Sequence, residues 1–383
     1  MMSADRESCE LLRAIVRRSP DPAMEGVDQL AGKVRDWDSL LRLADRHRMT
    51  PMLFLRIEDM GKAVPLTVQE RLRTEYQRNV FHSLANAAEL IAVLKVFDQE
   101  MIPAMPFKGV VLAASVYHDL SMRPAGDLDI LIHYRHLIRA TTVLLKRGYE
   151  LKTPVRADGT PEATDYFEYH FERQSDGMVI ELRWRLELAQ PRFRRNLGMD
   201  WVWPRRRTVM LAGAEVPDIN PEIALLVLCM HASKHIWSRL IWLCDVAQLL
   251  AAKPDLDWSE VMLQAKRTGL WRTLALGVLL ANRVAGAAVP AVILRRFESD
   301  KKAYNLALFI SENLFDSPGS LPRGRVPYSI QLLGFQDRIQ LLLSLDILRP
   351  NERDRSVVRL PKSLHGLYYL VRPFRILRDR SAR

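Results

Sequence analysis

The feature that most constrains the fold of this chain is a pair of aspartates at the start of a short apolar run. The run is Arg123-Pro-Ala-Gly-Asp127-Leu-Asp129-Ile-Leu-Ile-His133, which predicts a turn followed by a strand. Successive side chains of a strand point to opposite faces, so Asp127 and Asp129 share one face, and Leu128, Ile130 and Ile132 share the other. Two carboxylates so close repel each other, and a hard divalent cation such as Mg²⁺ relieves the repulsion. The pattern therefore predicts a metal site on a strand.

The residues before this run strengthen the prediction, because an isolated Asp-x-Asp pattern is more often a solvated loop or the face of an edge strand. Residues 102–107 predict a short strand, Lys108-Gly109 a turn, and residues 110–117 the start of an apolar helix. The N-terminus of a helix offers free N–H groups and the positive end of its dipole to an anion. This order of elements is typical of a phosphate-binding site.

These residues resemble the nucleotidyltransferases of the DNA polymerase beta superfamily, and within it the bacterial nucleotidyltransferase family proteins. That group has Lys-Gly before a helix, then Arg-x-x-x-Asp-hydrophobic-Asp, then a helix that ends near Gly-Tyr. The matching residues here are Lys108-Gly109, Arg123, Asp127-Leu-Asp129 and Gly148-Tyr149. The segment from His231 to Asp245 and residues 360–375 also resemble the group, so that the resemblance covers residues 80–383.

The resemblance implies an α+β fold in which helical regions flank a small mixed-sheet core. It implies that Asp127 and Asp129 hold the ions, Mg²⁺ or Mn²⁺, that bind a nucleoside triphosphate such as ATP. A third carboxylate on a later strand completes the catalytic and metal site of the superfamily. Its match is Glu181, which alternates with apolar neighbours as a strand residue facing a cleft should. The residues expected to bind the nucleotide are Lys108, Gly109 and Arg123.

The implied reaction is attack by an acceptor on the α-phosphorus of the nucleoside triphosphate, with release of pyrophosphate. The acceptor is an unidentified small molecule, peptide or protein. One departure from the superfamily pattern is Gly109-Val110 in place of Gly-Gly or Gly-Ser, so we hypothesise that Lys108 replaces the missing serine contact. Arg123 has three candidate roles, namely a phosphate contact, a clamp that pairs with Asp127, or a surface ion pair.

Four polar residues further along the chain form a second candidate cluster, which consists of His231, Lys234, His235 and Asp245. A spacing of four places the two histidines on one face of a helix, in a geometry that can bind zinc. The segment lacks the glutamate of a zinc protease helix, and the lysine between the histidines would repel a cation. We therefore expect this cluster to form a wall of the acceptor or nucleotide pocket.

The hydrophobic pattern predicts three regions along the chain. Helical spacing over residues 9–17, 37–47 and 68–97 predicts an N-terminal helical region, whereas strands and helices alternate from 101 to 190. Within that middle part, residues 166–173 and 178–184 predict a hairpin. The expected regions are an N-terminal helical region over 1–100, the nucleotidyltransferase core over 101–190, and a C-terminal helical domain with a basic tail over 191–383.

Composition limits the classes of partner. The 56 Lys and Arg residues against 45 Asp and Glu give a net charge of +11, which favours phosphate-rich partners without naming one. Nucleic acid stays open as a partner although no recognised reader motif supports it, and the basic clusters are more often solvated faces or tails. The three cysteines form no metal pattern, and the apolar segments are interrupted by charges and prolines. We expect a cytoplasmic protein without a transmembrane segment.

Three functions remain open from the sequence. The leading one is an Mg²⁺-dependent nucleotidyltransferase, and the alternative is a non-catalytic module that binds nucleotide or nucleic acid and retains the fold. A zinc-dependent hydrolase that uses the histidine cluster is the third. The presence of all three expected carboxylates favours catalysis, because a module that only binds need not keep such a costly cluster of negative charges.

Overall fold

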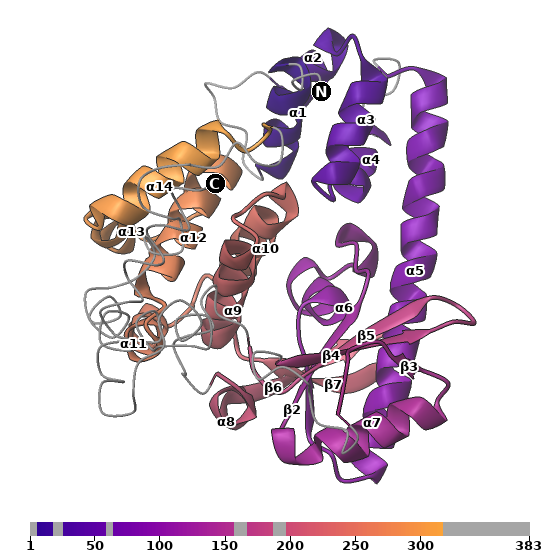
Figure 1. The fold of residues 1–383 in the computed structure, drawn as a ribbon. Helices are drawn as coiled ribbons and strands as arrows, with labels where there is room; N and C mark the ends of the chain where they lie inside the picture. Colours follow the sequence, from indigo (N-terminus) through magenta and orange to yellow (C-terminus); the bar gives the residue numbers. More distant parts are fainter. Residues whose placement is uncertain (1–5, 18–25, 59–63, 157–166, 187–196, 317–383) are drawn as a thin grey trace, which may run out of the picture. The chain divides into compact units, whose positions relative to one another are not determined.

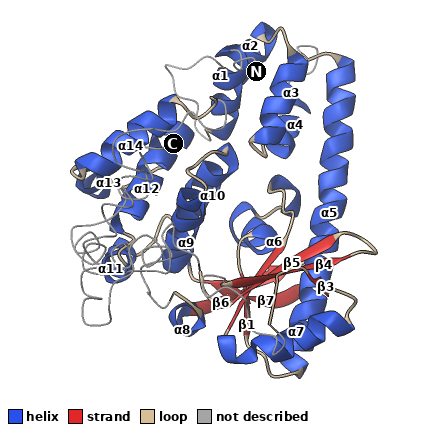
Figure 2. Cartoon of the chain, viewed as in Figure 1, coloured by secondary structure: helices blue, strands red, loops and turns tan. Residues whose placement is uncertain are grey.

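The computed structural model describes residues 6–17, 26–58, 64–156, 167–186 and 197–316. All of them belong to one compact unit, and residues 317–383 lie outside the described part of the chain. The predicted basic tail and the C-terminal segment 360–375 therefore also lie outside them. Helices and a mixed sheet make up the fold (Figure 2), which confirms the predicted α+β class.

A set of helices precedes the sheet. They are α1 (Arg6–Val16), α2 (Val27–Lys33), α3 (Trp37–Arg46), α4 (Thr50–Glu58) and α5 (Leu66–Gln99). The predicted helices over 9–17, 37–47 and 68–97 correspond to α1, α3 and α5, whereas α2 and α4 were not predicted. Proline is tolerated at the start of a helix, where its missing N–H would have no partner, and Pro51 lies in the first turn of α4. The long helix α5 runs from the N-terminal helices to the sheet (Figure 1).

Helix α5 also bears on the expectation that the chain has no transmembrane segment. Among the described helices it is the one that is long and apolar enough to cross a membrane, by length and composition alone. Its most apolar stretch is 33% buried inside the protein, and the helix as a whole packs on α4, α7 and β1. Core helices of soluble proteins have the same length and composition, so the expectation stays a prediction.

The central sheet has five strands in the order β1-β2-β5-β4-β3. Their bounds are β1 (Ala104–Pro106), β2 (Leu128–Ile132), β3 (Glu150–Leu151), β4 (Glu168–Arg173) and β5 (Met178–Arg183). Strands β2 and β5 are parallel, and the other neighbours are antiparallel. The strands predicted around Asp129 and Glu181 are confirmed, and so is the hairpin, which β4 and β5 form. Gly177 closes that hairpin with a φ of +69°, a conformation that glycine adopts without strain.

One face of this sheet is apolar and the other carries the carboxylates. Side chains of β2, β4 and β5 pack against α5 and α7 (Leu137–Lys146) in a buried cluster that includes Leu90, Ile130 and Phe171. Between β1 and β2 the chain forms α6 (Gly109–Leu112), which continues as a π-helical turn, Ala113–Tyr117. The helix predicted over residues 110–117 is thus present. Because helices cover the apolar face, the polar face with the carboxylates is the one that can bind a ligand.

The region after the sheet is mainly helical. After a short helix α8 (Met199–Val202), strands β6 (Arg206–Leu211) and β7 (Ala214–Ile219) form a separate hairpin that the sequence analysis did not predict. The remaining helices are α9 (Pro221–Lys234), α10 (Leu240–Ala252), α11 (Trp258–Thr268), α12 (Trp271–Ala285), α13 (Ala291–Glu298) and α14 (Lys301–Glu312). They share one hydrophobic core with α1–α4. Helices that precede the sheet in the sequence and helices that follow it therefore share one core. The predicted domain boundaries at residues 100 and 190 stay predictions.

Candidate active site

Three carboxylates converge on the polar face of the sheet. Asp129 lies within β2, and the parallel register places it directly beside Glu181 of β5. Asp127 immediately precedes β2, two residues before Asp129, and therefore points to the same face. Carboxylate oxygens of the three residues lie within 4.8 Å of one another, so one cation can contact all three. The structure thus brings together the predicted triad of Asp127, Asp129 and Glu181.

The three carboxylates differ in their partners. Asp129 is buried, and its two oxygens are taken by Lys108 at 2.9 Å and by Arg183 at 3.0 Å. Burial opposes ionisation of Asp129, but the charges of Lys108 and Arg183 outweigh it and hold its pKa well below the usual value. Glu181 pairs with the same arginine, whereas the Asp127 carboxylate has no ion pair or hydrogen bond to any described residue. Burial, and then the charge of Asp129, raise the pKa of Asp127.

This donor set suits a hard divalent cation. Carboxylate oxygens are the preferred ligands of Mg²⁺ and Mn²⁺, and the cluster contains no sulfur ligand. A cation bound beside Asp127 would supply the charge that this carboxylate lacks. Burial also raises the pKa of Glu181, and the neighbouring charges of Asp129 and Asp127 raise it further although Arg183 lowers it. The structure therefore fits a metal held by Asp127, Asp129 and Glu181.

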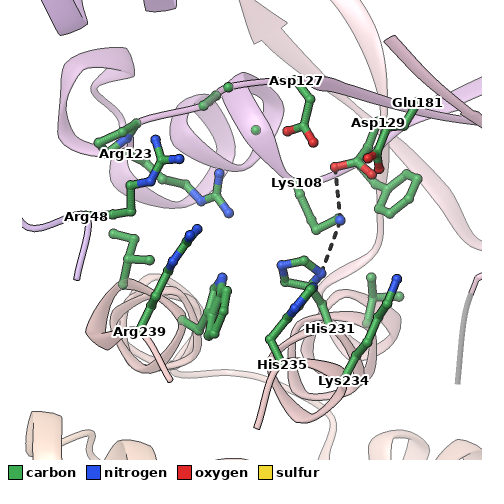
Figure 3. Close-up of a pocket in the computed structure, with 18 of the residues that line it drawn as sticks. Arg48, Lys108, Arg123, Asp127, Asp129, Glu181, His231, Lys234, His235 and Arg239 are labelled. Carbon is green, nitrogen blue, oxygen red and sulfur yellow. Dashed lines mark hydrogen bonds and ion pairs between the residues drawn. The ribbon is translucent and has the colours of Figure 1, made fainter. Parts of the chain in front are cut away.

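Lys108 occupies the centre of the site (Figure 3). Its Nζ lies 2.9 Å from Asp129 and 3.3 Å from Nδ1 of His231, which belongs to α9. The backbone of Lys108 has a φ of +59°, a conformation that costs energy for any residue other than glycine. Gly109 follows with a φ of +46°, and a side chain there would meet the carbonyl oxygen of Asp127 at 3.5 Å. This strained turn aims Lys108 at the carboxylates, where its ammonium competes with a metal for Asp129.

The competition gives a testable prediction. Lys108→Met should tighten Mn²⁺ binding to the nucleotide-free protein by about ten-fold, since it removes a cation that contacts a metal ligand. Titration of Mn²⁺ followed by electron paramagnetic resonance measures the change, and Lys108→Arg, which keeps the charge, serves as the control. Equal or weaker Mn²⁺ binding by Lys108→Met would refute the competition.

Arg123 has a partner that the sequence did not indicate. Its guanidinium donates to both carboxylate oxygens of Asp245, at 2.8 and 3.0 Å, and Tyr117 donates to the same carboxylate at 2.7 Å. All three side chains are buried. Of the candidate roles for Arg123, the structure does not show the clamp on Asp127, because a bidentate pair with Asp245 of α10 holds the arginine. Arg123 still lines the cavity beside the carboxylates, but Asp245 lies behind it and does not.

The other members of the histidine cluster do lie at the site. His231, Lys234 and His235, at the end of α9, line the same cavity as the carboxylates. His235 stacks on Trp242, with 5.1 Å between ring centroids. Burial, followed by the charge of Lys234, lowers the pKa of His235 to about 4, and burial followed by the charge of Lys108 lowers that of His231. With a lysine ammonium next to His231, a zinc ion on these histidines is disfavoured.

The cavity that joins these residues has a volume of about 560 Å³. Carboxylates from the sheet form one side, and cations from the helices form the opposite side (Figure 3). The cations include Arg48, in the turn between α3 and α4, and Arg239, which precedes α10. Sequence reasoning missed both arginines, because nothing local distinguishes them from other surface arginines. It also missed Arg183, for which a signal exists, since it lies two residues after Glu181 and so shares its face.

The turn that carries Arg48 is fixed to the start of α10 by a buried histidine. The Leu240 N–H donates to Nδ1 of His47 at 3.1 Å, and the Ile241 N–H donates to the His47 carbonyl oxygen at 3.3 Å. His47 is fully buried, and burial followed by the charges of Arg46 and Arg239 lowers its pKa to about 3. The neutral ring is required, because a protonated Nδ1 cannot accept the Leu240 hydrogen bond.

The depressed pKa of His47 predicts a pH dependence of stability. Between pH 6.5 and about 3 the unfolded chain binds a proton at this histidine and the folded protein does not, so the free energy of unfolding falls as the pH falls through that window. In His47→Gln this contribution is absent, and its stability should decline less steeply, by up to about 1.4 kcal/mol per pH unit. Urea denaturation of both proteins at several pH values measures the slopes. Equal slopes would contradict the prediction.

Comparisons with known proteins place this site in a family. Residues 33–286 match the family model described as "Uncharacterised nucleotidyltransferase". A search of the curated proteins finds no match. Among solved structures the chain is similar to the lincosamide antibiotic adenylyltransferase LnuA, lincomycin-bound, with a TM-score of 0.30 and 14% identity over 43% of this chain and 96% of that chain. The family match covers more than half of the chain and includes the carboxylate triad, which confirms the resemblance inferred from the sequence: the chain belongs to this family of nucleotidyltransferases.

Proposed function

We propose that this nucleotidyltransferase transfers a nucleoside monophosphate from a nucleoside triphosphate to an acceptor, with release of pyrophosphate, in a reaction that requires Mg²⁺ or Mn²⁺. The acceptor is a small molecule, a peptide or a protein. One observation carries the proposal: three carboxylates within 4.8 Å of one another face a wall of cations across a single cavity. Carboxylates that hold metal ions and cations that bind phosphates are the two parts that this transfer needs.

The roles of the residues follow from their positions. Asp127, Asp129 and Glu181 would hold the metal, which supplies charge stabilisation to the attacking and leaving oxygens. A bond forms between the acceptor nucleophile and the α-phosphorus, and the bond from that phosphorus to the oxygen of pyrophosphate breaks. The acceptor proton passes to Glu181, whose raised pKa suits it to hold a proton. When the nucleotide binds, the Lys108 ammonium moves from Asp129 to the phosphates. Its positive charge thus stays within the active site.

The alternative is a module that binds nucleotide or nucleic acid without catalysis. Asp127 argues against it, because a half-buried carboxylate without a cation partner destabilises the fold and a binding module has no need of it. The position of Asp127 next to two further carboxylates supports a metal ion at this place.

Nucleoside triphosphates labelled at either end distinguish the two functions. The protein is incubated with a mixture of metabolites and peptides and with ATP, GTP, CTP or UTP that carries ³²P at the α- or the γ-phosphorus. We expect one nucleotide to transfer the α-label to a product in the presence of Mg²⁺, while the γ-label appears in pyrophosphate. A product that carries the γ-label would overturn the proposal, and intact nucleotide with neither label transferred would favour the binding module.

A further inference from the structure

Two arginines from distant segments of the chain line the same side of the cavity. Arg48 lies in the turn between α3 and α4, and Arg239 is the residue immediately before α10. Figure 3 shows both residues on the side of the cavity away from Glu181. Both are solvent-exposed and line the cavity that holds the carboxylate triad, so a ligand in that cavity can reach them.

These two arginines lack, among the described residues, the direct ion pair that the neighbouring arginines have. Of the arginines among the described lining residues, Arg183 pairs with Asp129 and Arg123 pairs with Asp245. Arg48 and Arg239 form no ion pair in the described part of the chain. Burial, and then the charge of Arg48, lower the pKa of Arg239, and the charge of Asp45 opposes them only in part, so the two guanidinium groups repel each other as they stand. An anion placed between them would remove the repulsion and accept hydrogen bonds from both.

The chain holds the two arginines in place before any ligand arrives. The two hydrogen bonds between His47 and the start of α10 fix the segments on which they lie. Arg48 has a φ of +59°, a strained conformation that persists only where the surrounding structure enforces it. The guanidinium of Arg239 lies over the ring of Trp242, 5.5 Å from its centroid. Groups that are already fixed lose little freedom when they bind a ligand.

We propose that Arg48 and Arg239 together bind the terminal phosphates of the nucleoside triphosphate. This inference rests on the proposed function. A metal held by Asp127 would offset the charge of the phosphates nearest the reacting phosphorus, and the charge of the remaining phosphates would be met by other cations in the same cavity. Arg48 and Arg239 line that cavity and have no ion pair with any residue that the structure describes. Helices outside the sheet thereby contribute to substrate binding from both the N-terminal and the C-terminal part of the chain.

Binding of tripolyphosphate tests the inference separately from catalysis. Calorimetry compares wild type, Arg48→Gln and Arg239→Gln for inorganic tripolyphosphate without metal, and for nucleoside triphosphate and monophosphate with Mg²⁺. Each substitution should weaken tripolyphosphate and triphosphate binding by about ten-fold or more, the effect of losing a hydrogen bond to a charged group. Monophosphate binding should not change, because that ligand lacks the terminal phosphates.

The controls separate a local effect from a change in net charge or in folding. Arg42→Gln removes an exposed arginine of α3 that lies outside this cavity, and should bind all three ligands as the wild type does. All three arginines are exposed, so the variants should melt at the wild-type temperature. Wild-type triphosphate binding in Arg48→Gln and Arg239→Gln would overturn the inference, and so would equal weakening in Arg42→Gln. The proposed function fails by a different result, namely metal-dependent triphosphate binding that survives Asp127→Asn.

Discussion

Asp127→Asn is expected to lower metal-dependent nucleotidyl transfer by about 1000-fold or more, since metal ligands supply several kcal/mol of transition-state stabilisation. The same substitution should leave the metal-free protein at least as stable as the wild type. The raised pKa of Asp127 means that its ionised form costs stability, and this cost appears as the pH rises from the unfolded pKa through the folded one. At neutral pH the asparagine variant escapes that cost. Transfer rates and urea denaturation of the two proteins check both parts.

Asp129→Asn is the matched control, because Asp129 lies two residues after Asp127 and on the same face of the sheet. Its carboxylate is paired with Lys108 and Arg183, and its pKa is lowered, so it contributes stability that is present above the unfolded pKa and is lost as the pH falls. The variant should lose transfer and should also unfold more easily, by about 3–5 kcal/mol, because it leaves the buried ammonium of Lys108 without its ion pair and removes one of the carboxylate partners of Arg183. Equal stability losses in Asp127→Asn and Asp129→Asn would contradict this description of the site.

The second large effect is expected at the buried pair of Arg123 and Asp245. Asp245→Leu should lower the free energy of unfolding by about 3–5 kcal/mol, because it leaves the guanidinium of Arg123 buried without a partner. Tyr117→Phe removes one hydrogen bond to the same carboxylate and should cost only about 1 kcal/mol. Urea denaturation measures both variants.

A double variant separates the unpaired charge from other effects of the substitution. Arg123→Met combined with Asp245→Leu replaces the pair by apolar side chains and should recover much of the lost stability. If Asp245→Leu is as stable as the wild type, or the double variant is less stable than Asp245→Leu, the pair does not have the structural role assigned here.

The carboxylate triad could be predicted because its signals are local. Asp127 and Asp129 lie two residues apart, Glu181 alternates with apolar residues, and strands with this period place such residues on one face. The sequence also indicated that the two strands lie close, through the family resemblance. It could not give the register in which Asp129 lies beside Glu181.

The partners of the site could not be predicted, since they come from segments more than a hundred residues apart. Arg123 meets Asp245, and His47 meets Leu240, through tertiary packing that leaves no periodic pattern in the sequence. The hairpin β6–β7 was missed for another reason. Its arginines were interpreted as a solvated basic cluster, although alternate residues of β6 up to the buried Leu211 face inward with the period of a strand.

Calorimetric titration of nucleoside triphosphate with and without Mg²⁺, on the wild type and on Asp127→Asn, tests the central claim most directly. We expect the wild type to bind one of ATP, GTP, CTP and UTP more tightly with Mg²⁺, and Asp127→Asn to lose that metal-dependent gain. Binding that is indifferent to Mg²⁺, or that persists unchanged in Asp127→Asn, would contradict the claim that Asp127, Asp129 and Glu181 hold a catalytic metal.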